Sequence, residues 1–251
     1  MGQFKFIILF LFLTVVLLGK TVNSGIVSDL EIDRVATVNS VTTKTIEIKN
    51  RDDFKNILKK LSLKVEKFKD NLPILSGIIK SLPRAGTLGI KLDNFRTVTS
   101  GFKLKTKKGG VFYLRKNKNG KLEAKYLRSE VGKFEIGDKF NSSWYKPVFV
   151  LGNFVDKNEN NNEVFKLLKS NLLNKLSKME GVRVIANSKT DKVVSKLTDL
   201  NRRKILRRLY GVGIDYLIES NMNKNTNGYF IEFKIFSNYS GKLLLKEKIN
   251  I

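Results

Sequence analysis

The stretch VFVLGNFV, residues 148–155, is apolar at almost every position and follows directly on Pro147. A short apolar run of this kind is typical of a strand that is buried on both faces of its sheet. Such strands occur mainly in parallel or mixed sheets whose faces are covered by helices. We therefore expect the C-terminal half of the chain to be built around this strand.

The segments that follow alternate between helix and strand patterns. Phe165, Leu168 and Leu172 fall at the three- and four-residue spacings of one helix face. The predicted elements are a helix over 163–178, a strand over 182–186, a helix capped by Ser188 or Thr190, a helix from Asn201 to Gly211, a strand over 214–220, and a hairpin of 228–237 and 242–250. This order predicts an α/β sandwich with a mixed sheet, in which right-handed crossovers join the parallel strands and an antiparallel hairpin follows them.

Four stretches of this half resemble the domain shared by the N-terminal region of TolB, the curli-secretion channel protein and several flagellar outer-membrane accessory proteins. They are VFVLGNFVDKN (148–158), LLKSNLLNKLSKMEGVRVIANSKTDKVV (167–194), GVGIDYLIES (211–220) and FKIFSNYSGKLLLKE (233–247). Gly213 and Asp215 stand in the turn that enters a strand in that family. The resemblance covers 146–251 and implies an assembly or scaffold component of the cell envelope, without catalytic residues, that binds other envelope proteins.

Residues 25–145 carry the signals of a helix and a small antiparallel sheet or barrel. Apolar and polar residues alternate over 43–49, which predicts a strand, and Asn50 is a suitable N-cap for a basic amphipathic helix over 52–69. Further strands are predicted over 87–92, 96–105, 110–115, 121–127 and 133–140, with hairpin turns at Gly109-Gly110 and Asn119-Gly120. The polar segment 141–147 is the predicted domain boundary. The expected fold class is thus α+β and α/β: an N-terminal helix plus a small antiparallel β domain, then the C-terminal sandwich.

Residues 1–24 have the order of features found in a secretory signal peptide. Lys5 precedes the apolar run of residues 6–18, and Val22 and Ser24 stand at the two positions that a signal peptidase reads. The run is shorter than the roughly 20 residues that span a bilayer, although an uncleaved membrane anchor is the alternative. Because no cysteine follows the run, we expect an exported protein, periplasmic or associated with the outer membrane, that is not a lipoprotein.

The chain contains no cysteine and no histidine. Disulfides, thiolate nucleophiles and the usual zinc ligands are therefore excluded, as are catalytic sites that pair serine or cysteine with histidine. Sites made of carboxylates, or of serine and lysine, are left open, but no spacing places two carboxylates convincingly on a common face. We expect a protein that is not an enzyme and that holds no cofactor and no metal.

The formal net charge is +25, which favours anionic partners. Codon usage in an AT-rich genome is an alternative explanation for the many lysines, but it accounts less well for a cluster of arginines. That cluster supplies the candidate partner-binding residues, which are Arg202, Arg203, Lys204, Arg207 and Arg208. Arginine is suited to bidentate contact with carboxylates or phosphates, whereas a solvated helix face is the plain alternative.

A second basic segment interleaves cations with aromatic residues such as Phe112 and Tyr113. Its candidate polyanion-binding residues are Lys103, Lys105, Lys107, Lys108, Arg115 and Lys116. Such a surface can bind single-stranded nucleic acid, but alternating lysines also solvate one face of an ordinary sheet. Nucleic acid is not the expected partner of an exported chain. The sequence therefore supports two alternative functions. One is protein–protein binding in the envelope, and the other is binding of anionic lipid, wall polymer or nucleic acid. Self-association into a homo-oligomer is left open.

Overall fold

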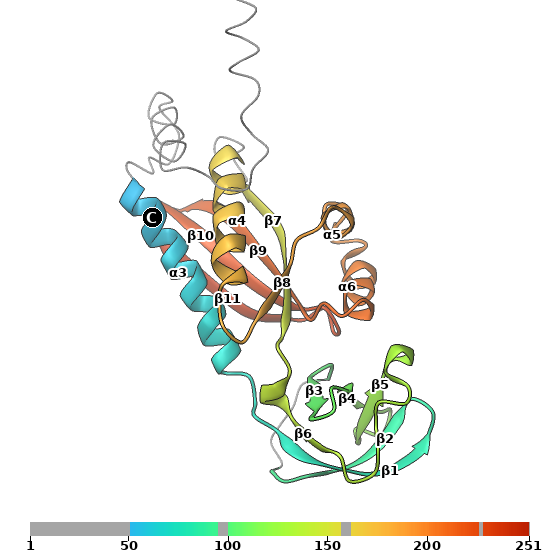
Figure 1. The fold of residues 1–251 in the computed structure, drawn as a ribbon. Coiled ribbons are helices and arrows are strands. Elements are labelled where there is room, and N and C mark those ends of the chain that lie inside the picture. Colours follow the sequence, from blue (N-terminus) through green and yellow to red (C-terminus); the bar gives the residue numbers. More distant parts are fainter. Residues whose placement is uncertain (1–50, 95–99, 157–161, 226–227, 251) are drawn as a thin grey trace, which may run out of the picture.

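The computed structural model describes residues 51–94, 100–156, 162–225 and 228–250. The chain forms two bodies, a small closed barrel and a helix-covered sheet (Figure 1). The predicted fold class, α+β with a mixed sheet, is confirmed. The predicted signal peptide over 1–24 and the predicted strand over 43–49 lie outside the described residues.

The barrel closes in the strand order β1-β2-β5-β4-β3-β6, and each neighbouring pair is antiparallel. Its elements are β1 (Ser76–Arg84), β2 (Thr87–Leu92), β3 (Lys103–Thr106), β4 (Val111–Lys116), β5 (Leu122–Tyr126) and β6 (Lys139–Asn141), with the short 3-10 turns η1 (Arg128–Glu130) and η2 (Ser142–Trp144). Aromatic rings fill its interior, where Phe112 meets Phe140 edge to face at 5.1 Å between ring centres. The alternating pattern of the sequence is thus explained by a one-sided core.

Three barrel strands differ from the prediction made from sequence. β1 is not among the predicted strands: it runs through Pro83 to Arg84, and the turn to β2 lies at Ala85 and Gly86. Pro83 lies where the register between β1 and β2 shifts, between Ser81 and Arg84, so its missing N–H interrupts no regular pair. β3 begins at Lys103, later than the predicted strand over 96–105. The strand predicted over 133–140 shrinks to β6, because Gly137 takes a φ of +92° in the turn before it.

The second body is a five-stranded sheet in the order β11-β10-β9-β7-β8. Its strands are β7 (Val148–Asp156), β8 (Arg183–Ile185), β9 (Tyr216–Asn225), β10 (Gly228–Ser237) and β11 (Leu243–Asn250). β7 pairs in parallel with β8 and β9, while β9, β10 and β11 pair antiparallel. This is the mixed sheet that the order of elements predicts.

Helices cover both faces of this sheet. They are α3 (Arg51–Asp70), α4 (Asn162–Ser177), α5 (Ser188–Val194) and α6 (Arg202–Gly211). Phe149 and Leu151 of β7 pack into the core under α3 and α4, and Val148 and Val150 pack into the core under α5 and α6. The predicted burial of β7 on both faces is therefore confirmed. No helix of the described ranges is long and apolar enough to cross a membrane.

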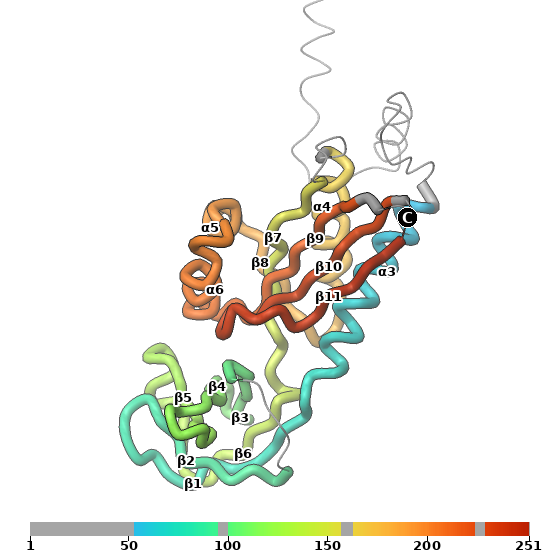
Figure 2. The backbone as a smooth tube through the Cα atoms, turned by 180° about the vertical axis from the view of Figure 1, so that it is seen from behind, coloured from blue at the N-terminus to red at the C-terminus, as the bar shows by residue number. Residues whose placement is uncertain are grey.

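The basic helix α3 belongs to the core of the sheet and not to that of the barrel. Phe54, Ile57 and Leu61 lie in the same cluster as Phe149. Seen from behind, α3 runs along β11 before the chain enters the barrel and returns through β6 into β7 (Figure 2). The prediction from sequence assigns this helix to the N-terminal domain, whereas its packing joins it to the sheet. The barrel is consequently inserted between α3 and β7.

Candidate functional site

The two bodies meet where the N-terminal ends of β7 and β9 lie side by side. The backbone N–H of Asp215 donates to the carbonyl of Val148 at 2.8 Å, and the N–H of Val148 donates to Oδ2 of Asp215, also at 2.8 Å. Gly213, two residues before Asp215, has a φ of +97°, a conformation that glycine adopts without strain. This turn holds the Asp215 carboxylate at the edge of the sheet that faces the barrel.

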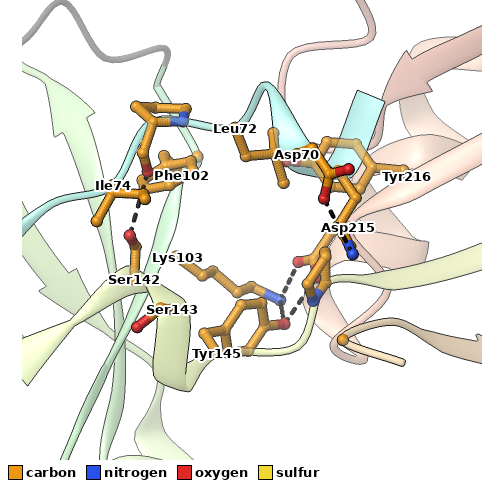
Figure 3. A pocket seen from close by; sticks show the side chains of 15 residues that line it. Asp70, Leu72, Ile74, Phe102, Lys103, Ser142, Ser143, Tyr145, Asp215 and Tyr216 are labelled. Atoms are coloured by element: carbon orange, nitrogen blue, oxygen red, sulfur yellow. Dashed lines mark hydrogen bonds and ion pairs between the residues drawn. The ribbon is translucent and has the colours of Figure 1, made fainter. Parts of the chain in front are cut away.

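Lys103 of β3 reaches from the barrel to this edge (Figure 3). Its Nζ lies 2.6 Å from Oδ1 of Asp215, and it also donates to the carbonyl of Gly213 at 3.2 Å and to the hydroxyl of Tyr145 at 3.3 Å. The Tyr145 hydroxyl donates in turn to Oδ2 of Asp215 at 2.7 Å. The side chains of Lys103 and Asp215 are 5% and 7% exposed, so each charge is compensated by these partners and not by water.

Burial governs the protonation of this cluster. It raises the pKa of the Asp215 carboxyl above its ordinary value, while the charge of Lys103 and the hydrogen bonds from Lys103, Tyr145 and Val148 act against the rise. Burial also raises the pKa of Tyr145, and the negative charge of Asp215 adds to that rise. Tyr145 therefore keeps its proton and acts as a donor at neutral pH.

A pocket of about 320 Å³ opens beside the cluster and is lined by both bodies (Figure 3). Leu72, Ile74 and Phe102 form apolar walls, and Lys69 pairs with Asp70 at 3.0 Å along the lining. The volume is at the lower limit of sites for small organic ligands. Lysine, tyrosine and aspartate are residue types of general acid–base sites. Here, however, the Lys103 ammonium group is already engaged in an ion pair with Asp215 and hydrogen bonds to Tyr145 and the carbonyl of Gly213.

Three tyrosines form a second contact between the bodies. The ring of Tyr113 in β4 lies 5.7 Å from that of Tyr210 in α6 and 5.8 Å from that of Tyr239, in the turn between β10 and β11. The Tyr210 hydroxyl donates to the carbonyl of Gly101 at 3.2 Å. The Lys103 Nζ lies 4.6 Å from the centre of the Tyr210 ring, within the range of a cation–π contact. These contacts tie the barrel to the C-terminal end of α6.

A second pocket, of about 400 Å³, separates the barrel from the C-terminal end of α6. We call it the α6 crevice. Val111, Tyr113 and Leu127 line it from the barrel, and Arg183 and Val212 line it from the sheet body. Val212 is largely exposed. Lys103, Ser129 and Glu130 also line it, so the crevice is a recess of mixed polarity with an exposed apolar side chain, Val212, beside the basic helix.

The structure divides the five predicted partner-binding residues of α6 into two groups. Arg202 points inward, where it donates to Oε2 of the buried Glu219 at 2.9 Å and stacks over the ring of Phe236. The other four are exposed, and they are Arg203, Lys204, Arg207 and Arg208. Arg202 is therefore corrected to a structural residue, because its guanidinium compensates a buried carboxylate.

The six predicted polyanion-binding residues do not form one free basic surface. Lys103 is corrected outright, because it is buried and paired with Asp215. Lys108 pairs with Glu135 and Asp138, and Arg115 pairs with Glu123 at 3.3 Å. The remaining three are exposed or half-buried, and they are Lys105, Lys107 and Lys116.

Sequence reasoning missed the joint between the two bodies. Lys103 looks like every other lysine in a strand that alternates basic and apolar residues, and Tyr145 lies in the segment interpreted as a linker. Asp215 is noticed at the start of a buried strand, but its partner comes from another body. No local sequence pattern predicts an ion pair between residues so distant in sequence.

In the described ranges, no group of three or more acidic residues could hold a metal ion.

Comparison with known proteins gives distant structural likeness. No family model matches the chain, and no curated protein matches it. The solved structures that are similar include the LpoB C-terminal domain from Escherichia coli, with 16% identity over 41% of this chain and 80% of that chain at a TM-score of 0.31. Another is lipoprotein GNA1162 from Neisseria meningitidis, with 17% identity over 43% and 80% at a TM-score of 0.30. The families named from sequence resemblance are not confirmed by these comparisons.

The predicted localisation is contradicted by these neighbours. GNA1162 is a lipoprotein, whereas the sequence predicts an exported protein, periplasmic or associated with the outer membrane, that is not a lipoprotein. That prediction depended on the absence of cysteine behind the apolar run of residues 6–18, which lie outside the described residues. The exclusion of a lipoprotein is therefore corrected.

Proposed function

We propose that this chain is a non-catalytic component of the cell envelope that binds another protein through the outer face of α6. The observation that carries the proposal is the set of four exposed cations on that face. Arg203, Lys204, Arg207 and Arg208 are exposed, and among the described residues no carboxylate lies within ion-pair distance of them. We call this set the α6 cation face.

Such a face is unfavourable for the isolated helix. Arg203 and Arg207 are four residues apart, as are Lys204 and Arg208, and like charges at this spacing destabilise a helix. A partner with an acidic surface would remove the repulsion and gain direct contacts. The uncompensated charge is thus better explained by binding than by stability.

The face is also held in a fixed position. Leu206 and Leu209 are buried against the sheet, and Arg202 anchors the first turn to Glu219. A rigid surface loses little conformational entropy when a partner binds. The contacts of α6 therefore support recognition by a preformed surface.

The Lys103 cluster supports the non-catalytic part of the proposal. Its amine is directed at Asp215, Tyr145 and the carbonyl of Gly213, and these contacts join two bodies. A lysine in this state is a charged structural group and not a nucleophile. The binding of lipid or polymer by the barrel is less favoured, since Lys103 and Lys108 are engaged with carboxylates.

Site-specific crosslinking tests the proposal. A photoreactive amino acid in place of Lys204 should form a covalent adduct with a protein in whole cells of the source organism. The same amino acid in place of Lys59, which is exposed on α3, is the matched control. Arg203→Glu with Arg207→Glu should abolish the adduct without lowering the melting temperature, because both side chains are exposed. An adduct that survives this double substitution, or one that forms equally at Lys59, contradicts the proposal.

A further inference from the structure

The turn between β10 and β11 brings cations from both bodies to one place. Tyr239 in this turn is half-buried between Tyr210 of α6 and Tyr113 of β4. Burial raises the pKa of the Tyr239 hydroxyl, while the positive charges of Arg115 and Arg207 both lower it. Arg207 lies three residues before Tyr210 on α6, and Arg115 lies two residues after Tyr113 on the same face of β4, so cations of both bodies flank the tyrosine contact.

Further cations extend the same surface. Arg203 lies beside the turn, since its Cγ is 4.0 Å from where a Cβ on Gly241 would be. Lys242 follows the turn and is exposed. Arg115 has one described counter-ion, Glu123, at 3.3 Å and with an exposed guanidinium, so an incoming carboxylate can compete for it. The positive potential thus crosses the joint between the bodies.

The α6 crevice adjoins this turn through Tyr113. Tyr113 both lines the crevice and contacts Tyr239, so the basic surface and the crevice are contiguous. The crevice presents Val111, Leu127 and the exposed Val212 beside the charged side chains of Glu130 and Arg183. A ligand that follows the surface meets carboxylate-binding groups first and then a recess of mixed polarity that has room for an apolar side chain beside Val212.

We propose that the partner presents an acidic segment that crosses the joint, with its carboxylates on Arg115 and Arg207 and an apolar side chain in the α6 crevice. This inference rests on the proposed function and specifies the chemistry of the partner. Arginine pairs bidentately with carboxylates, and an apolar anchor in a pocket is the usual centre of a protein interface. Because the segment touches both bodies, it recognises their relative position, which Lys103 and Asp215 fix.

An acidic protein segment accounts for more of the surface than a phosphate polymer or a lipid headgroup does. Phosphates would use the guanidinium groups equally well, but they would leave Val212 and the crevice unused. Substitution of Val212 therefore separates the segment from the two other anions.

The test uses the full chain and a defined probe. The probe is a fluorescein-labelled peptide of aspartate and glutamate with one central leucine, and its affinity is measured by fluorescence anisotropy at about 50 mM salt, where charge contacts are weakly screened. Arg115→Glu and Arg207→Glu should each weaken binding about tenfold or more, as loss of a charge-assisted contact implies. Val212→Ser, which removes apolar surface without adding a charge, should also weaken it. Lys80→Glu, an exposed cation on β1 away from the joint, is the matched control and should have little effect.

Each outcome decides the inference. If Arg207→Glu weakens binding and Arg115→Glu behaves like Lys80→Glu, the segment does not cross the joint and the inference fails, while the proposed function stands. If the peptide does not bind but Lys204 still crosslinks to a partner, the same conclusion holds. If polyphosphate or phosphatidylglycerol vesicles bind as tightly and Val212→Ser does not change the affinity for the peptide, the surface is a general anion site and the inference fails. Arg115→Gln replaces Arg115→Glu if the latter fails to fold.

Discussion

Lys103 of the barrel and Asp215 of the sheet form a buried ion pair, with 2.6 Å between Nζ and Oδ1. Each residue lies in a different body, so the pair fixes how the bodies are oriented. Taking two charges out of water is costly, and the cost is offset here by the hydroxyl of Tyr145, the carbonyl of Gly213 and the N–H of Val148. The joint should therefore be sensitive to the loss of either charge.

Lys103→Met should lower the free energy of unfolding by about 3–5 kcal/mol, because it leaves the Asp215 carboxylate buried without its cation. Urea unfolding followed by circular dichroism measures the loss. Lys64→Met is the matched control, since Lys64 pairs with Glu247 at 3.0 Å in a partly exposed position and should cost at most about 1 kcal/mol. Equal losses of unfolding free energy in the two variants would show that the buried pair contributes no more to stability than the partly exposed pair.

Arg202→Met should lower stability more than the same substitution at an exposed arginine of α6. It removes the cation from Glu219, whose side chain is 6% exposed, so we expect a loss of about 3–5 kcal/mol in the free energy of unfolding. Arg203→Met should change that free energy by about 0.5 kcal/mol or less, as surface substitutions usually do. Thermal melting of the two variants checks this. Equal melting temperatures would contradict the assignment of Arg202 as structural and Arg203 as an exposed residue without effect on stability.

Gly101→Ala should weaken the contact between the barrel and the sheet. Gly101 has a φ of +91°, and a Cβ there would lie 2.4 Å from the Cβ of Tyr239, so both backbone strain and a clash oppose the substitution. Gly109→Ala is the control, because Gly109 has a φ of +96° and nothing within 4 Å of such a Cβ. Gly109→Ala should cost about 1–3 kcal/mol of unfolding free energy from strain alone. Gly101→Ala should cost clearly more, and equal costs would mean that Tyr239 moves aside freely.

Glu232 of β10 predicts a pH dependence of stability. Burial by itself raises the pKa of Glu232, but hydrogen bonds and charges from Lys234 and Lys246 outweigh it and leave the pKa below its ordinary value. A carboxyl whose pKa is lowered in the folded state stabilises that state above the unfolded pKa of about 4.3, and the contribution is lost as the pH falls through the folded pKa. Glu232→Gln should therefore be less stable than the parent at pH 7, by at most about 1 kcal/mol, and equally stable at the acid end. Unfolding curves at several pH values test this, and a constant difference across them would contradict it.

The sequence pattern was sufficient for most of the second body. The apolar run of 148–155 predicts a doubly buried strand, and the helix and strand spacings around it predict the mixed sheet. The pattern could not show where α3 packs, because an apolar stripe such as Phe54, Ile57 and Leu61 has no preference between two cores. Nor could it separate Lys103 from Lys105, since both stand in the same alternating strand. Their difference lies in Asp215, which reaches β3 only through the tertiary fold.

The position of α3 has a consequence for synthesis. The ribosome makes residues 51–70 early, but the strands and the helix that cover their apolar stripe, among them α4 and β11, are made after the whole barrel. The barrel lies in the chain between α3 and these elements, so it can close before the packing partners of α3 have been synthesised. During that interval the stripe of the nascent polypeptide is open to solvent, and it is the natural place for a chaperone to hold the growing chain.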